Sequence, residues 1–238
     1  MVAAALAAWG RQHGIDIGVM KAVATGGRRF LEEGKPLWVS DDAVRLKEAG
    51  GVDDPWSLIN PICFKEPLAP WTAAMRAHRP IRIERILQAF HALSVQHHWL
   101  IVEGVGGLEV PLTSRMTVAD LAGTLRLPIL LVASPELGTL NQTLLSLAAI
   151  RRRKLPLIGV VMNQRCALPR DHMSRVAIQT NPLVLRRFSR VPIFGPLPFR
   201  ATKRENDWSA YLLSRWIEQA LGAPLLHRVM GSRNGYFD

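Results

Sequence analysis

The stretch WLIVEGVGG, residues 99–107, decides the fold class. It places four apolar residues in a row, then a single carboxylate, Glu103, and then a glycine-rich turn. A continuous apolar run of this length is typical of a strand covered on both faces, because a half-exposed strand alternates between apolar and polar residues. Polar side chains that follow such a strand predict a ligand site at its carboxyl end.

Four further apolar runs have the length of a strand, and helical patterns lie between them. The runs are IDIGVMKAV from residue 15, LPILLVASP from residue 127, LPLIGVVMN from residue 155 and the weaker VPIFGPLP from residue 191. The helical patterns are IERILQAFHALSVQH, TVADLAGTLR, LNQTLLSLAAIRRRK and VLRRFS. Strands that alternate with helices predict an α/β fold, with a mostly parallel central sheet and helices on both faces. We expect a single domain over residues 1–238, with a short polar tail from about residue 226.

Composition and charge narrow the class of protein. The chain has 238 residues, 48% of them hydrophobic, and it lacks an apolar stretch long enough to span a bilayer. Its two cysteines, Cys63 and Cys166, are not spaced as metal ligands, which favours a reducing compartment and a cytoplasmic protein. The formal net charge of +11 suits small anionic ligands or nucleic acid. Nucleic acid is not expected as a partner, because we find no recognition helix and no aromatic platform.

Polar residues follow the predicted strands. Lys21 ends the first strand, and a lysine there is costly unless it meets an anion. Glu103 could ligate Mg²⁺ beside substrate phosphates, or it could be a structural carboxylate that accepts bonds from backbone N–H groups. Asp41 and Asp42 begin a helix, so either could be a second magnesium ligand or simply a first-turn acid.

Two more segments end strands with groups suited to recognition. The segment Gly138–Asn141 starts a helix, where free N–H groups bind a carboxylate or phosphate. Asn163 ends the fourth strand, and its amide can donate and accept at once, as reading a purine edge requires. Because parallel strands end at one edge of a sheet, we expect these groups and Lys21 to converge on one rim.

Six motifs in this order resemble the dethiobiotin synthetase family. They are KAVATGG, SDDAVRL, INPICFKEPLAPWTAA, VEGVGGLEVPL, LGTLNQTLL and GVVMN followed by GPLPF. The resemblance covers residues 2 to about 200. It implies a P-loop NTPase-like fold and an ATP-dependent ligase of biotin biosynthesis, which carboxylates 7,8-diaminononanoate with CO₂ and closes the ring to dethiobiotin. It also implies ATP and Mg²⁺ as cofactors.

The first residues, MVAAALAAWGRQHG, read as a helix without a capping residue. In the family such a helix follows a strand and a phosphate loop that ends in GKT. The resemblance therefore implies that the first strand and the phosphate loop are missing from this chain, through a start codon assigned too late or a truncation. We expect the strands beside the gap to expose unpaired edges. The alternative function is a degenerate, non-catalytic relative that acts as a binding or partner protein.

The resemblance also assigns catalytic and metal roles. Lys21 would steady the carbamate and the phosphoryl group, and Thr25 would hydrogen-bond the substrate nitrogen or carbamate. Asp42 and Glu103 would hold Mg²⁺ against the nucleotide phosphates, and Gly106 would lie beside the nucleotide.

The remaining roles concern the base and the substrate tail. Asn163 would read adenine, with the backbone of Leu197 and Pro198 lining the same pocket. Gly138, Thr139, Leu140 and Asn141 would take the carboxylate tail of the diamine, across a homodimer interface.

Overall fold

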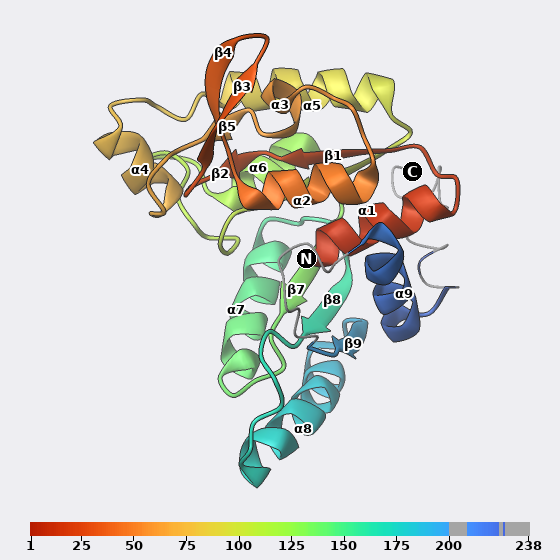
Figure 1. Cartoon of the computed structure of the whole chain (residues 1–238). Coiled ribbons are helices and arrows are strands. Elements are labelled where there is room, and N and C mark those ends of the chain that lie inside the picture. Colours follow the sequence, from red (N-terminus) through yellow and green to blue (C-terminus); the bar gives the residue numbers. More distant parts are fainter. Residues whose placement is uncertain (200–208, 224–225, 227–238) are drawn as a thin grey trace. The chain divides into compact units, whose positions relative to one another are not determined.

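The computed structural model describes residues 1–199, 209–223 and 226 (Figure 1). It divides into two compact units. The first holds Met1 and Ala3–Arg126, and the second holds Val2 and the chain from Leu127. Of the polar tail expected from about residue 226, only Leu226 is described, and the single-domain prediction stays a prediction.

The first unit contains two parallel strand pairs, one antiparallel hairpin and the helices around them. Its elements are α1 (Val2–Gln12), β1 (Ile17–Lys21), β2 (Val23–Ala24), β3 (Arg28–Glu32), β4 (Lys35–Val39), α2 (Asp41–Gly50), α3 (Trp56–Ile59), β5 (Ile62–Cys63), α4 (Pro70–Arg76), α5 (Ile83–Gln96), β6 (Trp99–Glu103) and α6 (Val118–Leu125). β1 pairs with β6 and β2 with β5, both in parallel, while β3 and β4 are antiparallel.

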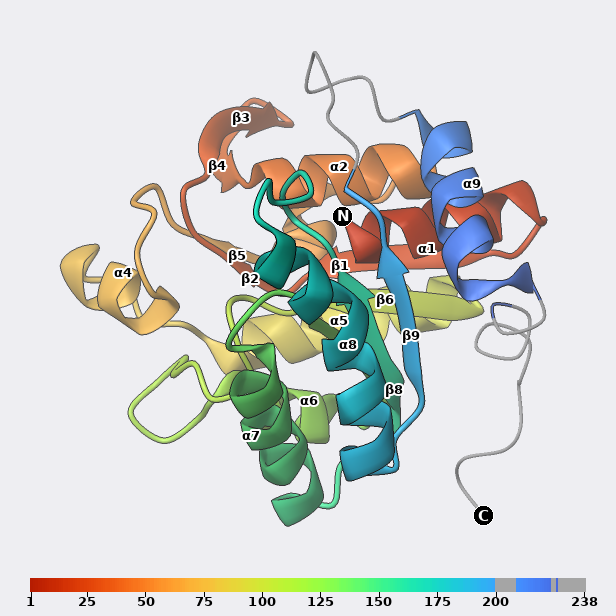
Figure 2. The ribbon, with the colours of Figure 1, turned by 90° about the horizontal axis from the view of Figure 1, so that it is seen from below.

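β1 lies between helices. Every residue of β1 is buried, as its continuous apolar run predicts. Figures 1 and 2 both place this strand between α2 and α5, so its two faces are covered. α1 runs beside α2. Gly50, the last residue of α2, has no side chain, so Ala7 of α1 and Val19 of β1 can lie close to its backbone.

The hairpin of β3 and β4 was not among the predicted strands. A two-residue turn joins its strands, and both turn residues, Glu33 and Gly34, have positive φ angles of 50° and 75°. Positive φ at both central positions is the type I′ geometry, which matches the twist of the flanking strands. Its burial is partial, so it lacks the long apolar run by which the other strands were recognised.

The second unit is a three-stranded parallel sheet with helices. Its elements are β7 (Ile129–Ala133), α7 (Thr139–Arg152), β8 (Leu157–Asn163), α8 (His172–Ser189), β9 (Ile193–Leu197) and α9 (Ala210–Leu221). The strand order is β7, β8, β9. α7 and α8 lie on one side of this sheet and α9 on the other (Figures 1 and 2).

α8 is longer than its sequence pattern predicts. The prediction placed a helix only at VLRRFS, whereas α8 begins at His172 and contains Pro182 in its interior. Its start is capped by Asp171, whose carboxylate accepts a hydrogen bond from the backbone N–H of Ser174 at 2.8 Å.

The fold class is α/β, with parallel strands and helices as predicted. Within the described residues β1, β6, β7 and β9 each pair with a single strand, so one edge of each has no strand partner there. That the strands beside a missing strand expose unpaired edges stays a prediction. Nowhere in the described part of the chain is a helix both long and apolar enough to cross a bilayer.

Candidate functional site

A buried lysine between two carboxylates forms the centre of the candidate site in the first unit. The Nζ atom of Lys21 lies 2.9 Å from Asp42 Oδ2 and 2.9 Å from Glu103 Oε1. It also donates to the backbone carbonyl of Gly104 at 2.9 Å. Lys21 is only 5% exposed, so its three donors are directed at protein oxygens. The structure therefore brings together three of the residues that the sequence singled out.

Two local features produce this arrangement. The parallel register of β1 and β6 pairs Lys21 with Glu103 at the carboxyl ends of the two strands, so their side chains share a face. Asp42 reaches the same point from the first turn of α2. That helix begins at Ser40, whose hydroxyl accepts a hydrogen bond from the backbone N–H of Ala43 at 3.2 Å.

The charges of the cluster stabilise one another. Burial opposes the charged form of Lys21, but Glu103 and Asp42 outweigh it and raise the pKa of Lys21 above its ordinary value. Burial likewise opposes ionisation of Asp42, but Lys21 outweighs it and lowers the pKa of Asp42. The α-amino group of Met1 lies close enough to interact with these charges, and burial lowers its pKa.

The two aspartates at the start of α2 have different partners. Asp41 pairs with Arg28 at 2.7 Å, and both side chains are more than half exposed. Asp42 faces Lys21 and lies 3.7 Å from Arg45. Of the two aspartates that the sequence left open, Asp42 is therefore the one in the cluster.

Two glycine-containing turns border the cluster in the chain. Thr25 is half-buried in the turn after β2. In this turn the backbone N–H of Gly26 donates to the backbone carbonyl of Glu66 at 3.3 Å. Gly106 follows β6 with a φ angle of +63°, and a Cβ there would lie 2.9 Å from Val110. A side chain at Gly106 would be strained on both counts, so this loop requires glycine.

The predicted base-recognition residues are neighbours in the second unit. Asn163 of β8 is paired in register with Leu197 of β9. Asn163 is half-buried, the side chain of Leu197 is fully buried, and Pro198 is exposed. The backbone carbonyls of Leu197 and Pro198 already accept hydrogen bonds. That of Leu197 accepts from the backbone N–H of Gln164, and that of Pro198 from the indole N–H of Trp216, each at 3.0 Å. Because Lys21 and Asn163 lie in different units, their convergence on one rim stays a prediction.

The segment Gly138–Asn141 starts α7 as predicted, but Thr139 points inward. Its hydroxyl is 3.1 Å from that of Thr143, and both residues are buried. The backbone N–H of Thr139 donates to the backbone carbonyl of Glu136. Gly138, with a φ angle of 93°, and Asn141 are exposed, and Leu140 is half-buried. The side chain of Thr139 is therefore engaged within the unit.

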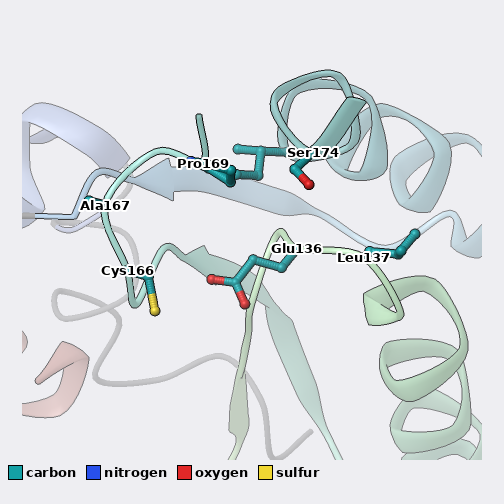
Figure 3. Close-up of a pocket in the computed structure, with 7 residues that line it drawn as sticks. Glu136, Leu137, Cys166, Ala167, Pro169 and Ser174 are labelled. Carbon is teal, nitrogen blue, oxygen red and sulfur yellow. The ribbon is translucent and has the colours of Figure 1, made fainter. Parts of the chain in front are cut away.

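A pocket of about 330 Å³ lies beside this segment, between the loops that follow β7 and β8 (Figure 3). Its lining residues are Glu136, Leu137, Cys166, Ala167, Pro169, Ser174 and Ile178. The Glu136 carboxylate and the Cys166 thiol point into the same space. None of the lining residues is basic, so the pocket is poorly suited to a substrate carboxylate.

Sequence reasoning missed two contributors to the first-unit cluster. The carbonyl of Gly104 carries no sequence signal beyond its place after Glu103. Asn60 is buried, and its side-chain amide donates to the backbone carbonyl of Lys21 at 2.8 Å. The sequence feature that could have pointed to Asn60 is its place before Pro61 in the motif INPICFKEPLAPWTAA. Residue spacing does not show, however, which backbone groups an asparagine will meet.

Comparison with known proteins gives the family. Residues 1–205 match the sequence model of an AAA domain. The ATP-dependent dethiobiotin synthetase of Anaeromyxobacter dehalogenans is 44% identical over 163 residues, which are 68% of this chain and 70% of that protein. The chain belongs to the ATP-dependent dethiobiotin synthetase family. The synthetase of Bacillus cereus is 36% identical over 210 residues, 86% of this chain and 81% of its own. That of Thermodesulfovibrio yellowstonii is 35% identical over 195 residues, 79% of this chain and 78% of its own.

Membership of the dethiobiotin synthetase family confirms the resemblance drawn from the six motifs. The matching AAA domain agrees with the predicted P-loop NTPase-like α/β class. Its relatives are ATP-dependent synthetases by name. The absence of the phosphate loop and the roles of individual residues stay predictions.

Proposed function

We propose that this protein is an ATP-dependent dethiobiotin synthetase, a ligase that converts 7,8-diaminononanoate and CO₂ to dethiobiotin in biotin biosynthesis. The names of the relatives support the product, dethiobiotin, and the ATP dependence. The single observation that carries the proposal is the buried Lys21, which meets Asp42 and Glu103 at 2.9 Å each.

The reaction creates negative charge at each step. One amine of the diamine attacks CO₂ and loses a proton, which gives a carbamate. A carbamate oxygen attacks the γ-phosphorus of ATP, and ADP leaves. The second amine then attacks the carbamate carbon, the ring closes, and orthophosphate leaves. Phosphoryl transfer of this kind is catalysed mainly by positioned cations and N–H groups.

Lys21 is the cation that suits these steps. Its ammonium has a raised pKa, so it stays charged at neutral pH. In our proposal it donates to the carbamate and to the transferred phosphoryl group, and Thr25 hydrogen-bonds the substrate nitrogen or carbamate.

The carboxylates suit a magnesium ion. No group of three His, Cys, Asp or Glu residues gathers as a metal site in the part of the chain that the structure describes. Asp42 and Glu103 nonetheless face one point, and Mg²⁺ typically uses one or two carboxylates together with phosphates and water. These two residues would hold the ion, which would neutralise phosphate charge when bound.

The rest of the site is proposed from the second unit. Asn163, with the backbone near Leu197 and Pro198, would recognise adenine. Gly106, which belongs to the first unit, would lie against the nucleotide. Gly138, Leu140 and Asn141 would bind the carboxylate of the diamine, with Thr139 contributing only through its place in the segment. The proposed enzyme is a cytoplasmic homodimer, and its partners are small molecules.

The test is the complete reaction. The purified chain is incubated with ATP, Mg²⁺, 7,8-diaminononanoate and labelled bicarbonate, and labelled dethiobiotin and orthophosphate are counted. We expect one orthophosphate for each dethiobiotin, and no product when either ATP or the diamine is omitted. Calorimetry with ATP and Mg²⁺ measures nucleotide affinity and so tests the alternative, a degenerate, non-catalytic relative. A folded chain that forms no dethiobiotin would contradict the proposal, and if it also bound no nucleotide it would be a non-catalytic relative.

A further inference from the structure

Asn60 is a buried polar residue to which the proposed reaction gives no role. It follows α3, precedes β5, and is 3% exposed. A buried amide must satisfy both its donors and its acceptor, so its partners show what it holds together.

All hydrogen bonds of the Asn60 side chain reach backbone or hydroxyl groups of other segments. Its Nδ2 donates to the carbonyl of Lys21 at 2.8 Å and to that of Ile62 at 3.2 Å. Its Oδ1 accepts from the backbone N–H of Ser40 at 3.1 Å and from the hydroxyl of Ser40 at 3.2 Å. One side chain thus joins the end of β1, the start of β5 and the residue that caps α2.

Only an amide of this length satisfies these four bonds. A carboxylate at position 60 could still accept from Ser40, but it would face the carbonyl of Lys21 without a proton to donate. With an apolar side chain, the backbone N–H of Ser40 and the carbonyls of Lys21 and Ile62 would all lose the amide as a partner.

The joined segments carry two residues of the charge cluster. Lys21 is itself the last residue of β1, and Asp42 stands two residues after Ser40 in the first turn of α2. The Lys21 backbone is therefore tied through Asn60 to the helix end that presents Asp42. Lys21 Nζ and Asp42 Oδ2 then lie 2.9 Å apart.

We propose that Asn60 is a positioning residue, which sets the separation of Lys21 and Asp42 through its bonds to the Lys21 carbonyl and to Ser40. This inference rests on the proposed function for the roles of those two side chains. The bonding itself can be tested without turnover.

The first measurement is the acylation rate of Lys21 in the full chain, followed by mass spectrometry, with the exposed Lys35 as internal reference. In the native protein Lys21 is held by three oxygens, so we expect it to react slowly. In Asn60→Ala we expect about tenfold faster acylation relative to Lys35, the change expected when one charge-assisted hydrogen bond is lost. Leu93→Ala is the matched control, because it destabilises the same unit from a fully buried site in α5 and should leave the ratio unchanged.

A second pair of variants keeps the test decisive even where Asn60→Ala fails to fold. Ser40→Ala removes the hydroxyl that bonds Asn60 and caps α2, and Ser40→Thr restores it. We expect faster Lys21 acylation in the first and a return toward the native rate in the second. In active protein, kcat should fall about ten- to hundredfold in Asn60→Ala and Ser40→Ala. The KM for the diamine should stay within about threefold.

The outcomes separate this inference from the proposed function. Folded Asn60→Ala and Ser40→Ala variants whose Lys21 acylation stays within about twofold of native would overturn it. So would equal acceleration in Leu93→Ala, which would indicate general loosening. A native chain that makes no dethiobiotin would refute the proposed function alone, since the acylation ratios would still decide whether Asn60 holds Lys21.

Discussion

At the scale of single residues, the cluster is held by mutual compensation of charge. Two carboxylates facing one point repel each other, and a buried ammonium is costly in the absence of anions. Lys21 and Asp42 therefore favour each other's charged forms, which leaves Lys21 charged and oriented before a substrate arrives. Such preorganised charge is the largest contribution that a protein typically makes to phosphoryl transfer.

Glu103→Gln should lower both catalysis and stability. The amide keeps the shape and can still accept from Lys21, but it loses the charge that a magnesium ion requires and that compensates the buried ammonium. We expect dethiobiotin formation to fall at least about a hundredfold at saturating Mg²⁺, and the melting temperature to fall as well.

The control for this variant is Glu66→Gln, which changes a carboxylate in an exposed pair with Arg76. Exposed pairs contribute little, so both activity and melting should stay native. Equal activity of Glu103→Gln and Glu66→Gln would contradict a role for Glu103.

A second charged group, at the other end of β1, predicts a pH dependence of stability. His97 Nδ1 lies 2.8 Å from Asp16, and His97 Nε2 lies 3.1 Å from Asp54. His98 shares Asp16 at 3.1 Å. Burial opposes protonation of His97, but the two carboxylates outweigh it and raise the pKa of His97 above its ordinary 6.5. This stabilisation is fully present below the ordinary pKa and is lost as the pH rises through the raised value.

The ring of His97 lies against Gly18, which allows a specific test. A Cβ at Gly18 would be 2.5 Å from Cδ2 of His97, so Gly18→Ala should displace the ring and cost about 1–3 kcal/mol. In urea unfolding the native protein should be more stable at about pH 6 than at about pH 8.5, by no more than about 1 kcal/mol. This difference should shrink in Gly18→Ala. Gly107→Ala, where a Cβ meets open space, should behave as native, and an unaltered pH difference in Gly18→Ala would refute the account.

At the scale of elements, the loop before α7 depends on α8. Asn181 of α8 is buried, and its amide donates to the carbonyls of Pro135 at 2.9 Å and Glu136 at 3.1 Å. This bonding holds the loop just before the segment Gly138–Asn141, which we propose to bind the substrate tail. A loop fixed in this way needs no large ordering when a ligand binds.

Asn181→Ala should therefore lower the free energy of unfolding by about 1–3 kcal/mol, because two carbonyls lose their donor. Amide exchange in the loop at residues 134–138 should accelerate. Thr180→Ala is the matched control, since its exposed hydroxyl bonds only within α8, and it should change stability by less than about 0.5 kcal/mol. If the two variants were equally stable, Asn181 would not hold this loop.

At the scale of the whole molecule, the sequence predicts strands better than it predicts contacts. Continuous apolar runs located β1, β6, β7, β8 and β9. Full burial, which such runs predict, holds along the whole of β1 only, whereas β6 and most of β7 are half-buried among the described residues. The β3–β4 hairpin is partly exposed and gives no such run. The start of α8 was missed because Pro182 interrupts its helical pattern, although Asp171 offered a capping signal.

The same distinction applies to the candidate site. Lys21 and Glu103 were predictable as a pair, because parallel strands align their carboxyl ends. The residue pattern alone left Asp41 and Asp42 open, since the choice depends on which way each carboxylate leaves the first turn of α2, and only the family resemblance assigned Asp42. Asn60 and the inward turn of Thr139 depend on tertiary packing, which residue spacing does not encode.

The most direct test of the central claim compares dethiobiotin formation by the native chain with that by Lys21→Met, each shown to be folded by circular dichroism. We predict ATP-dependent product from the native chain and a rate below about one-hundredth of it in the variant. A folded Lys21→Met protein that keeps more than about half of the native rate would contradict the claim that this cluster carries the chemistry.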